Sequence, residues 1–209
     1  MSVIKIFGCH RTCTNLTTVL LRRNFRCRVL TNHPWHKHDE WGQEDRTVYD
    51  HDDSLLTEEV KFVICAKNPY DYIQSTFKFF THRADKYRFR GSLEEWIDGW
   101  PKMDALERYN RLYSHWLGLS EDSSVVQLVK AEEAVKRQDR ILDRLQYEMG
   151  LESKREDLAP VETVVNPCEK VTAAPYRYKG NSLTEEQVAA INNRISEETM
   201  ALLGYEIQT

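Results

Sequence analysis

Residues 3–15 read VIKIFGCHRTCTN, and this stretch predicts how the fold begins. Val3 to Phe7 is a short apolar run rich in β-branched residues, which favours a buried strand. Gly8 ends the run, a loop rich in hydroxyl and basic side chains follows, and a helical pattern begins near Thr14. A strand, a tight loop and a helix in this order form an anion site, because the first turn of a helix presents backbone N–H groups and a partial positive charge.

The same alternation continues along the chain. Further strands are expected at residues 27–30, 61–66 and 124–129, and helices are expected at 14–24, from Pro69, from Ser92, at 106–117, at 131–149 and from Thr184, the last with Val188, Ile191 and Ile195 on one face. Residues 31–59 and 152–182 are expected to be loops. The pattern predicts a single α/β domain over 1–209, a three-layer sandwich around a mostly parallel sheet with a P-loop-like nucleotide-binding fold. Ligands of such folds lie at the carboxyl ends of the strands, which places the loops after Phe7 and Ala66 on one edge.

Composition and charge limit the class of ligand. The 209-residue chain is 41% hydrophobic and 30% charged, as globular proteins are, and its net charge of −4 argues against nucleic acid as a partner. Residues 1–38 contain seven Lys or Arg and no acid, and residues 61–91 contain seven against two acids, whereas residues 39–60 carry nine acids against one base. A cleft lined by both basic blocks would bind a polyanion. A solvated basic face is the alternative.

Cysteine usage and hydropathy predict the compartment. The chain contains five cysteines, Cys9, Cys13, Cys27, Cys65 and Cys168. Their odd number and the lack of CxxC spacing indicate reduced thiols. A strand expected almost at Met1 leaves no room for a signal peptide, and no apolar run approaches the length of a membrane span. We therefore expect a soluble, cytoplasmic protein that has no membrane partner.

The loop after the first strand does not have the form of a Walker A motif, because no Gly-Lys-Ser/Thr follows Gly8. The strand ending at Ala66 is followed by Lys67, where a nucleotide hydrolase often has an acid that holds magnesium. We therefore expect the site to neutralise its anion with Arg, Lys and helix dipoles, without a metal ion.

Two segments resemble a known family. Residues 8–15, GCHRTCTN, resemble the 5′-phosphosulfate loop of sulfotransferases, which usually has Lys/Arg-Ser-Gly-Thr/Ser at the head of the first helix. Residues 67–75, KNPYDYIQS, resemble the 3′-phosphate motif of that family, usually Arg-Asn-Pro, an Asp two residues later, and a Ser eight residues after the Arg. Residues 125–133 with Gly150-Leu151 are similar to a later strand and turn, so the resemblance runs over most of the chain.

The resemblance implies an enzyme that transfers a sulfuryl group in line from 3′-phosphoadenosine-5′-phosphosulfate (PAPS) to a hydroxyl or amine acceptor, with no metal required. It implies that Arg11 is catalytic and stabilises charge on the bridging oxygen. The residues that it implies for the cofactor are Arg11, Thr12, Cys13, Thr14 and Asn15 at the 5′ end, Lys67 and Ser75 at the 3′-phosphate, and Arg177, Lys179 and Gly180 from a second 3′-phosphate segment, for which a surface turn is the alternative.

Two residues depart from the family pattern. Cys13 stands where the family usually has Gly, and a positive φ there would strain a cysteine. Lys67 stands where Arg is usual, which keeps the charge and loses the bidentate geometry. Either change would weaken the affinity for the cofactor or accompany a different function.

A general base is needed to deprotonate the acceptor, and residues 33–40, HPWHKHDE, are its expected source. In some short sulfotransferases a Trp-Lys-His triplet supplies the base, which favours His38 and then His36. Three His within six residues also suit a zinc site, and a solvated loop is a further alternative.

Two other functions remain open from the sequence. A degenerate P-loop kinase or nucleotide hydrolase would bind ATP with magnesium, and a non-catalytic nucleotide- or glycan-binding module would bind without turnover. The acceptor is a small molecule or a carbohydrate whose identity the sequence leaves open, like the oligomeric state. The aromatics Trp96, Trp100, Tyr109, Tyr113 and Trp116 are expected to be core, with one or two lining an acceptor pocket.

Overall fold

The computed structural model describes residues 1–31, 38, 60–82, 88–161, 163–164, 174–175 and 182–209. The strands are β1 (Ser2–Gly8), β2 (Cys27–Leu30), β3 (Val60–Ala66), β4 (Val126–Lys130), β5 (Thr163–Val164) and β6 (Ala174–Pro175). The helices are α1 (Thr14–Asn24), α3 (Pro69–Thr81), α4 (Leu93–Asp98), α5 (Ala105–Leu117), α6 (Ala131–Lys136), α7 (Gln138–Met149), α8 (Glu185–Asn192) and α9 (Glu197–Leu203).

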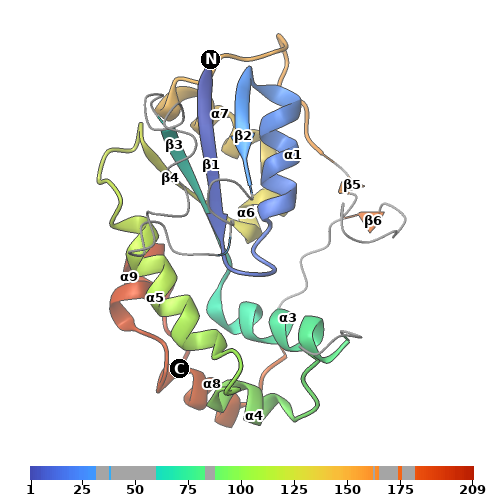
Figure 1. Ribbon diagram of the computed structural model, residues 1–209, viewed down its shortest axis with the longest axis vertical. Coiled ribbons are helices and arrows are strands. Elements are labelled where there is room, and N and C mark those ends of the chain that lie inside the picture. The colour runs from blue at the N-terminus through green and yellow to red at the C-terminus, as the bar shows by residue number, and fades with distance from the viewer. Residues whose placement is uncertain (32–37, 39–59, 83–87, 162, 165–173, 176–181) are drawn as a thin grey trace, which may run out of the picture.

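Four parallel strands form the central sheet in the order β2-β1-β3-β4 (Figure 1). In this register Gly8 of β1 lies beside Cys65 of β3, so the last residues of both strands reach the same edge. The strands β5 and β6 form a separate antiparallel pair. The expected α/β class and the mostly parallel sheet are confirmed, and the central sheet is parallel throughout.

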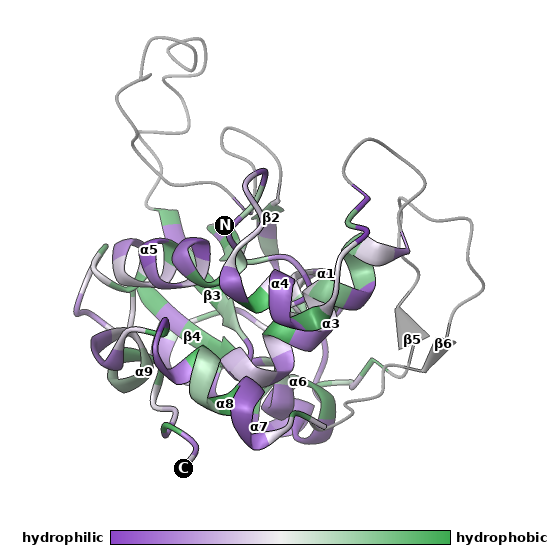
Figure 2. Ribbon diagram, turned by 90° about the horizontal axis from the view of Figure 1, so that it is seen from below, coloured by the Kyte–Doolittle hydropathy of each residue, from purple (hydrophilic) through white to green (hydrophobic). Residues whose placement is uncertain are grey.

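A separate apolar core covers each face of the sheet. One core joins Phe7, Phe62 and Ile64 to helices α3, α4, α5, α8 and α9. The other joins Ile6 and Val63 to helices α1, α6 and α7. Figure 2 shows the matching pattern, with strands that are largely hydrophobic and helices striped in both colours. Neighbouring residues of each strand therefore point into different layers, and the chain forms a three-layer α/β arrangement.

The expected helix starts agree with the capping observed. The Asn68 side chain accepts from the Tyr70 N–H at the start of α3, and capping boxes begin α4 at Ser92 and α8 at Thr184. The helix α7 ends at Gly150, which has the left-handed conformation with φ 59° that glycine tolerates.

Two helical expectations are wrong. Residues 131–149 form two helices instead of one, because the backbone of Arg137 is not helical (φ −143°, ψ 53°) between α6 and α7. The side chain of Gln138, next to this break, exchanges two hydrogen bonds with the backbone of Val161. The C-terminal segment is also two helices, since Ile195 lies in the turn between α8 and α9.

Among the described residues, no helix is both long enough and apolar enough to span a membrane.

Candidate functional site

The site lies where the order of the strands reverses. From β1 the chain runs through α1 to β2 on one side, and then returns across β1 to β3 on the other side. The helix α1 packs on one face of the sheet, and α3, which follows β3, contributes to the core of the other face. In open parallel sheets a crevice forms at this switch point, outside the carboxyl ends of the strands. The loop after Gly8 and the residues after Ala66 therefore lie together at this edge of the sheet, which we call the crevice after the place that such ligands occupy.

The start of the loop requires a glycine. A Cβ at Gly8 would lie 2.6 Å from the Cys65 carbonyl oxygen and 2.6 Å from the Thr12 hydroxyl oxygen, closer than real contacts allow. Thr12 is fully buried and its hydroxyl donates to the Cys9 carbonyl at 2.7 Å, so that proton is used within the loop. Close packing of β1, β3 and the loop thus fixes the path of residues 9–13.

Two residues of the loop have a strained backbone. Arg11 and Cys13 both have φ 68°, in the left-handed region that L-residues other than glycine rarely adopt. The strain that the sequence predicts for a positive φ at Cys13 is therefore present. Such a conformation costs roughly 1–2 kcal/mol per residue and is concentrated at functional sites.

The loop delivers the N-terminus of α1 to the crevice. Cys13 is the N-cap of α1, and within the described structure its side chain is not used as a cap. The first turn contains buried Thr14 and half-buried Asn15, and it has no acidic residue. The positive end of the helix dipole therefore faces the loop without a carboxylate of that turn to compensate it.

The side chain of Arg11 extends from this loop to α3. Its guanidinium carbon lies 5.4 Å from the centre of the Phe79 ring. Phe79 is one helical turn beyond half-buried Ser75, so both residues lie on one face of α3. The structure thus places Arg11 and Ser75, which come from the two segments that resemble nucleotide motifs, on the same side of that helix.

Two charged residues, Lys67 and Asp71, follow β3. Burial lowers the pKa of Lys67, and the negative charge of Asp71 opposes that shift. The Lys67 ammonium also interacts electrostatically with Cys13 and Arg11, which places it beside the loop. Burial raises the pKa of Asp71 to about 6, and the Lys67 charge opposes the rise. Among the residues described, no group donates a hydrogen bond to Asp71 Oδ1, although the side chain is only 7% exposed.

Two tyrosines of α5 support the ends of the strands from below the crevice. The Tyr113 hydroxyl donates to the Cys65 carbonyl at 2.7 Å and accepts from the Cys9 N–H at 3.4 Å. The Tyr109 hydroxyl donates to the Lys67 carbonyl at 2.7 Å. Burial raises the pKa of both hydroxyls well above the usual range, so they remain donors at neutral pH. Their burial was predicted, whereas their hydrogen bonds to the strand ends were not.

His38 reaches the same loop from the segment after β2. Its Nδ1 contacts the Gly8 carbonyl oxygen, and its own carbonyl accepts a hydrogen bond from Arg108 of α5. Because a carbonyl only accepts, Nδ1 carries a proton, and in the neutral ring Nε2 is then the basic nitrogen. The ring is 7% exposed and stacks on His10 at 4.1 Å between centroids. His10 was not predicted as a site residue, although its place two residues after Gly8 is a usable signal.

The remaining predicted residues are not placed. His36, Arg177, Lys179 and Gly180 lie outside the described residues. The described part of the chain holds no group of three or more His, Cys, Asp or Glu side chains arranged for a metal ion. Comparison of the sequence with protein-family models and with curated proteins finds no match.

Proposed function

We propose that this chain is a sulfotransferase that binds PAPS at the switch point between β1 and β3 and transfers a sulfuryl group to a hydroxyl or amine acceptor. One observation carries the proposal. The two segments that resemble the nucleotide motifs of that family, residues 8–15 and 67–75, lie side by side at one edge of the sheet although about fifty residues separate them.

The residues present fit a nucleotide that carries an anionic group at each of two ends. The N-terminus of α1 and the Arg11 guanidinium would hold the 5′ end, and Lys67 with Ser75 would hold the 3′-phosphate. The glycine at position 8 lets the backbone of the loop pack tightly below the ligand. When bound, PAPS would supply the sulfuryl group, and the bond from sulfur to the acceptor oxygen would replace the bond from sulfur to the phosphate oxygen. Arg11 stabilises the charge that remains on the departing phosphate.

His38 is the proposed general base. Its Nδ1 proton is directed to the Gly8 carbonyl, so the ring is oriented by the same loop that would hold the 5′ end. Nε2 would take the proton from the acceptor hydroxyl as the new bond to sulfur forms. The stacking of His38 on His10 restricts the ring further.

Thermal stabilisation tests the nucleotide. We expect adenosine 3′,5′-bisphosphate without metal to raise Tm more than ATP with magnesium does, because a ligand stabilises the native state according to its affinity. Arg11→Ala and Lys67→Ala should each abolish the shift, and Arg140→Ala on the exposed face of α7 should retain it. A larger shift with magnesium-ATP would indicate a kinase or nucleotide hydrolase instead. A full shift in both binding-site variants would show that the nucleotide binds elsewhere.

A further inference from the structure

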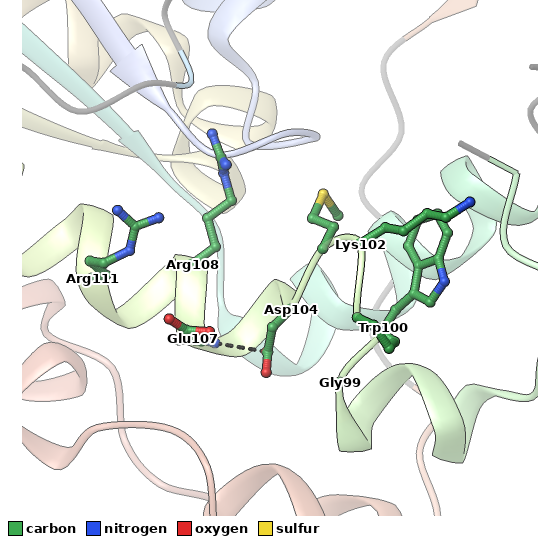
Figure 3. A pocket seen from close by; sticks show the side chains of 9 residues that line it. Gly99, Trp100, Lys102, Asp104, Glu107, Arg108 and Arg111 are labelled. Carbon is green, nitrogen blue, oxygen red and sulfur yellow. Dashed lines mark hydrogen bonds between the residues drawn. The ribbon is translucent and has the colours of Figure 1, made fainter. Parts of the chain in front are cut away.

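A cavity of about 380 Å³ opens beside the N-terminal half of α5 (Figure 3). Its wall is formed by Gly99, Trp100, Pro101, Lys102, Met103, Asp104, Glu107, Arg108 and Arg111. A second hollow of about 480 Å³ shares Trp100 and Lys102 with the first and adds Arg88, Phe89, Arg90, Gly91 and Glu95. Both volumes are in the range of small-molecule sites. Trp100 therefore stands between two adjoining hollows.

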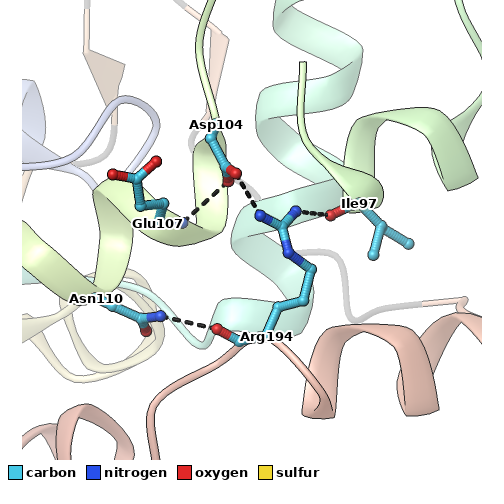
Figure 4. A network of polar contacts seen from close by, with 5 residues as sticks. All are labelled: Ile97, Asp104, Glu107, Asn110 and Arg194. Atoms are coloured by element: carbon cyan, nitrogen blue, oxygen red, sulfur yellow. Dashed lines mark hydrogen bonds and ion pairs between the residues drawn. The ribbon is translucent and has the colours of Figure 1, made fainter. Parts of the chain in front are cut away.

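Cations dominate these walls. Five Lys or Arg side chains line the two hollows, against three carboxylates. Asp104 is bound by the Arg194 guanidinium, which comes from the turn between α8 and α9 (Figure 4). Glu95 accepts from the Ser92 N–H at 2.9 Å in the capping box of α4. Asp104 is thus paired by an arginine outside the lining, which leaves three cations against Glu107 in the 380 Å³ cavity, so this cavity favours an anion.

The cavity adjoins the proposed general base. Arg108 lines it and also donates to the His38 carbonyl. In Figure 3 the Arg108 side chain points away from Asp104 and toward the ends of the strands. A ligand in the cavity would therefore approach His38 from the side of α5.

We infer that this cavity binds the acceptor and selects a saccharide that carries a carboxylate or sulfate group, an inference that rests on the proposed function. The Trp100 ring, over which Lys102 Nζ lies at 5.6 Å from the centroid, offers a flat apolar surface to one face of a sugar ring. The planar Arg111 guanidinium matches the two oxygens of a carboxylate or sulfate. A neutral sugar would use the Trp100 surface alone.

Calorimetry with a matched pair of sugars tests this selection. The 4-nitrophenyl β-glucuronide and β-glucoside differ by a carboxylate in place of a hydroxymethyl group. We expect the glucuronide to bind at least about tenfold more tightly, because hydrogen bonds to charged groups are stronger than neutral ones. Lys102→Gln and Arg111→Gln should each reduce this preference, and both residues are exposed, so the fold should tolerate the changes. Arg140→Gln on α7 is the matched control and should leave the preference intact.

Two further measurements, with a pair of phenols and with adenosine 3′,5′-bisphosphate, distinguish the possible outcomes. A preference for 4-hydroxybenzoate over phenol without a preference for the glucuronide would show that an aromatic acid is selected, which overturns the inference. Equal binding of the two glycosides, or binding of neither, also overturns it. The measurement does not need turnover. A glucuronide preference in a protein that adenosine 3′,5′-bisphosphate does not stabilise would support the anionic sugar site and refute the proposed function alone.

Discussion

The Tyr113 hydroxyl donates a hydrogen bond to the Cys65 carbonyl at 2.7 Å and so ties α5 to the end of β3 at the candidate site. The same oxygen accepts from the Cys9 N–H at 3.4 Å. One side chain thus connects the ends of β1 and β3, the two strands whose loops border the crevice. Because Tyr113 is fully buried, water cannot replace these hydrogen bonds without rearrangement of the core.

Tyr113→Phe should lower the free energy of unfolding by about 1–3 kcal/mol, since it leaves the Cys65 carbonyl and the Cys9 N–H without this partner. Urea unfolding measures the change. Tyr147→Phe is the matched control, because Tyr147 is 86% exposed and should be neutral. An equal effect of both substitutions on the free energy of unfolding would show that the hydrogen bonds of the Tyr113 hydroxyl do not stabilise the fold.

Gly8→Ala should destabilise the fold by about 1–3 kcal/mol, because the added Cβ meets the Cys65 carbonyl and the Thr12 hydroxyl at 2.6 Å. It should also weaken the binding of adenosine 3′,5′-bisphosphate, as the loop must move. Gly118→Ala at the end of α5 has a negative φ and a nearest contact of 3.2 Å, and it should cost less. Chemical denaturation and thermal shift together check both effects.

Cys13→Gly should be more stable than Cys13→Ala by about 1 kcal/mol, because only glycine adopts φ 68° without strain. Both variants lose the buried sulfur, so the comparison isolates the backbone. At Cys27 in β2 the order should reverse, since glycine weakens a strand. The free energies of unfolding of the four variants test this. If the glycine variant were the less stable one at both positions, the strain at Cys13 would be contradicted.

Asp71→Asn should change the pH dependence of nucleotide binding. Because the pKa of Asp71 is raised to about 6, the carboxyl is neutral at pH 5 and charged at pH 7.5, where it opposes a phosphate at Lys67. The ratio of the wild-type Kd to the variant Kd for adenosine 3′,5′-bisphosphate should rise from near one at pH 5 to about three- to tenfold at pH 7.5. The phosphates titrate equally in both proteins and cancel in this ratio. A ratio that stays flat, or that falls with pH, would refute the assignment.

His38→Ala should lower kcat by about 10²- to 10⁴-fold, the usual contribution of a general base. The thermal shift with adenosine 3′,5′-bisphosphate should remain, because His38 is proposed to act on the acceptor. His82→Ala, at the exposed end of α3, should leave the rate unchanged. Loss of nucleotide binding along with the rate would assign His38 a role in shaping the loop instead.

The local structure could be predicted from the sequence where a single pattern dominates. The four strands of the central sheet are short segments rich in apolar residues, and side-chain caps mark Asn68, Ser92 and Thr184 as helix starts. The break at Arg137 has no such signal in the sequence, because the residues around it favour a helix. The hydrogen bonds that Gln138 makes beside the break are to Val161, which is distant in the chain. The order of the strands is likewise a property of tertiary packing, which periodicity does not encode.

The candidate site was predictable only in part. The resemblance proposes Arg11, Lys67 and Ser75 by spacing, and the strand order places the two segments that carry them at one edge of the sheet. The hydrogen bonds of Tyr109 and Tyr113 were missed, because an aromatic stripe on a helix has the same pattern whether or not its hydroxyls have partners. Trp100 belongs to an aromatic group that was expected to be core, with one or two members lining a pocket. It is half-buried, packs against the core and lines two hollows, since the chain turns at Pro101 before α5 begins.

The bond between Cys9 and Tyr113 spans 104 positions of the chain. During synthesis on the ribosome, β1 and the loop emerge well before the helix that supports them. The nascent chain therefore carries an unfinished loop, with strained residues and an unsatisfied Cys9 N–H, until α5 has left the exit tunnel. The proposed nucleotide binding cannot precede that moment, and a translational pause before α5 would prolong the interval in which proteases or chaperones meet the incomplete sheet.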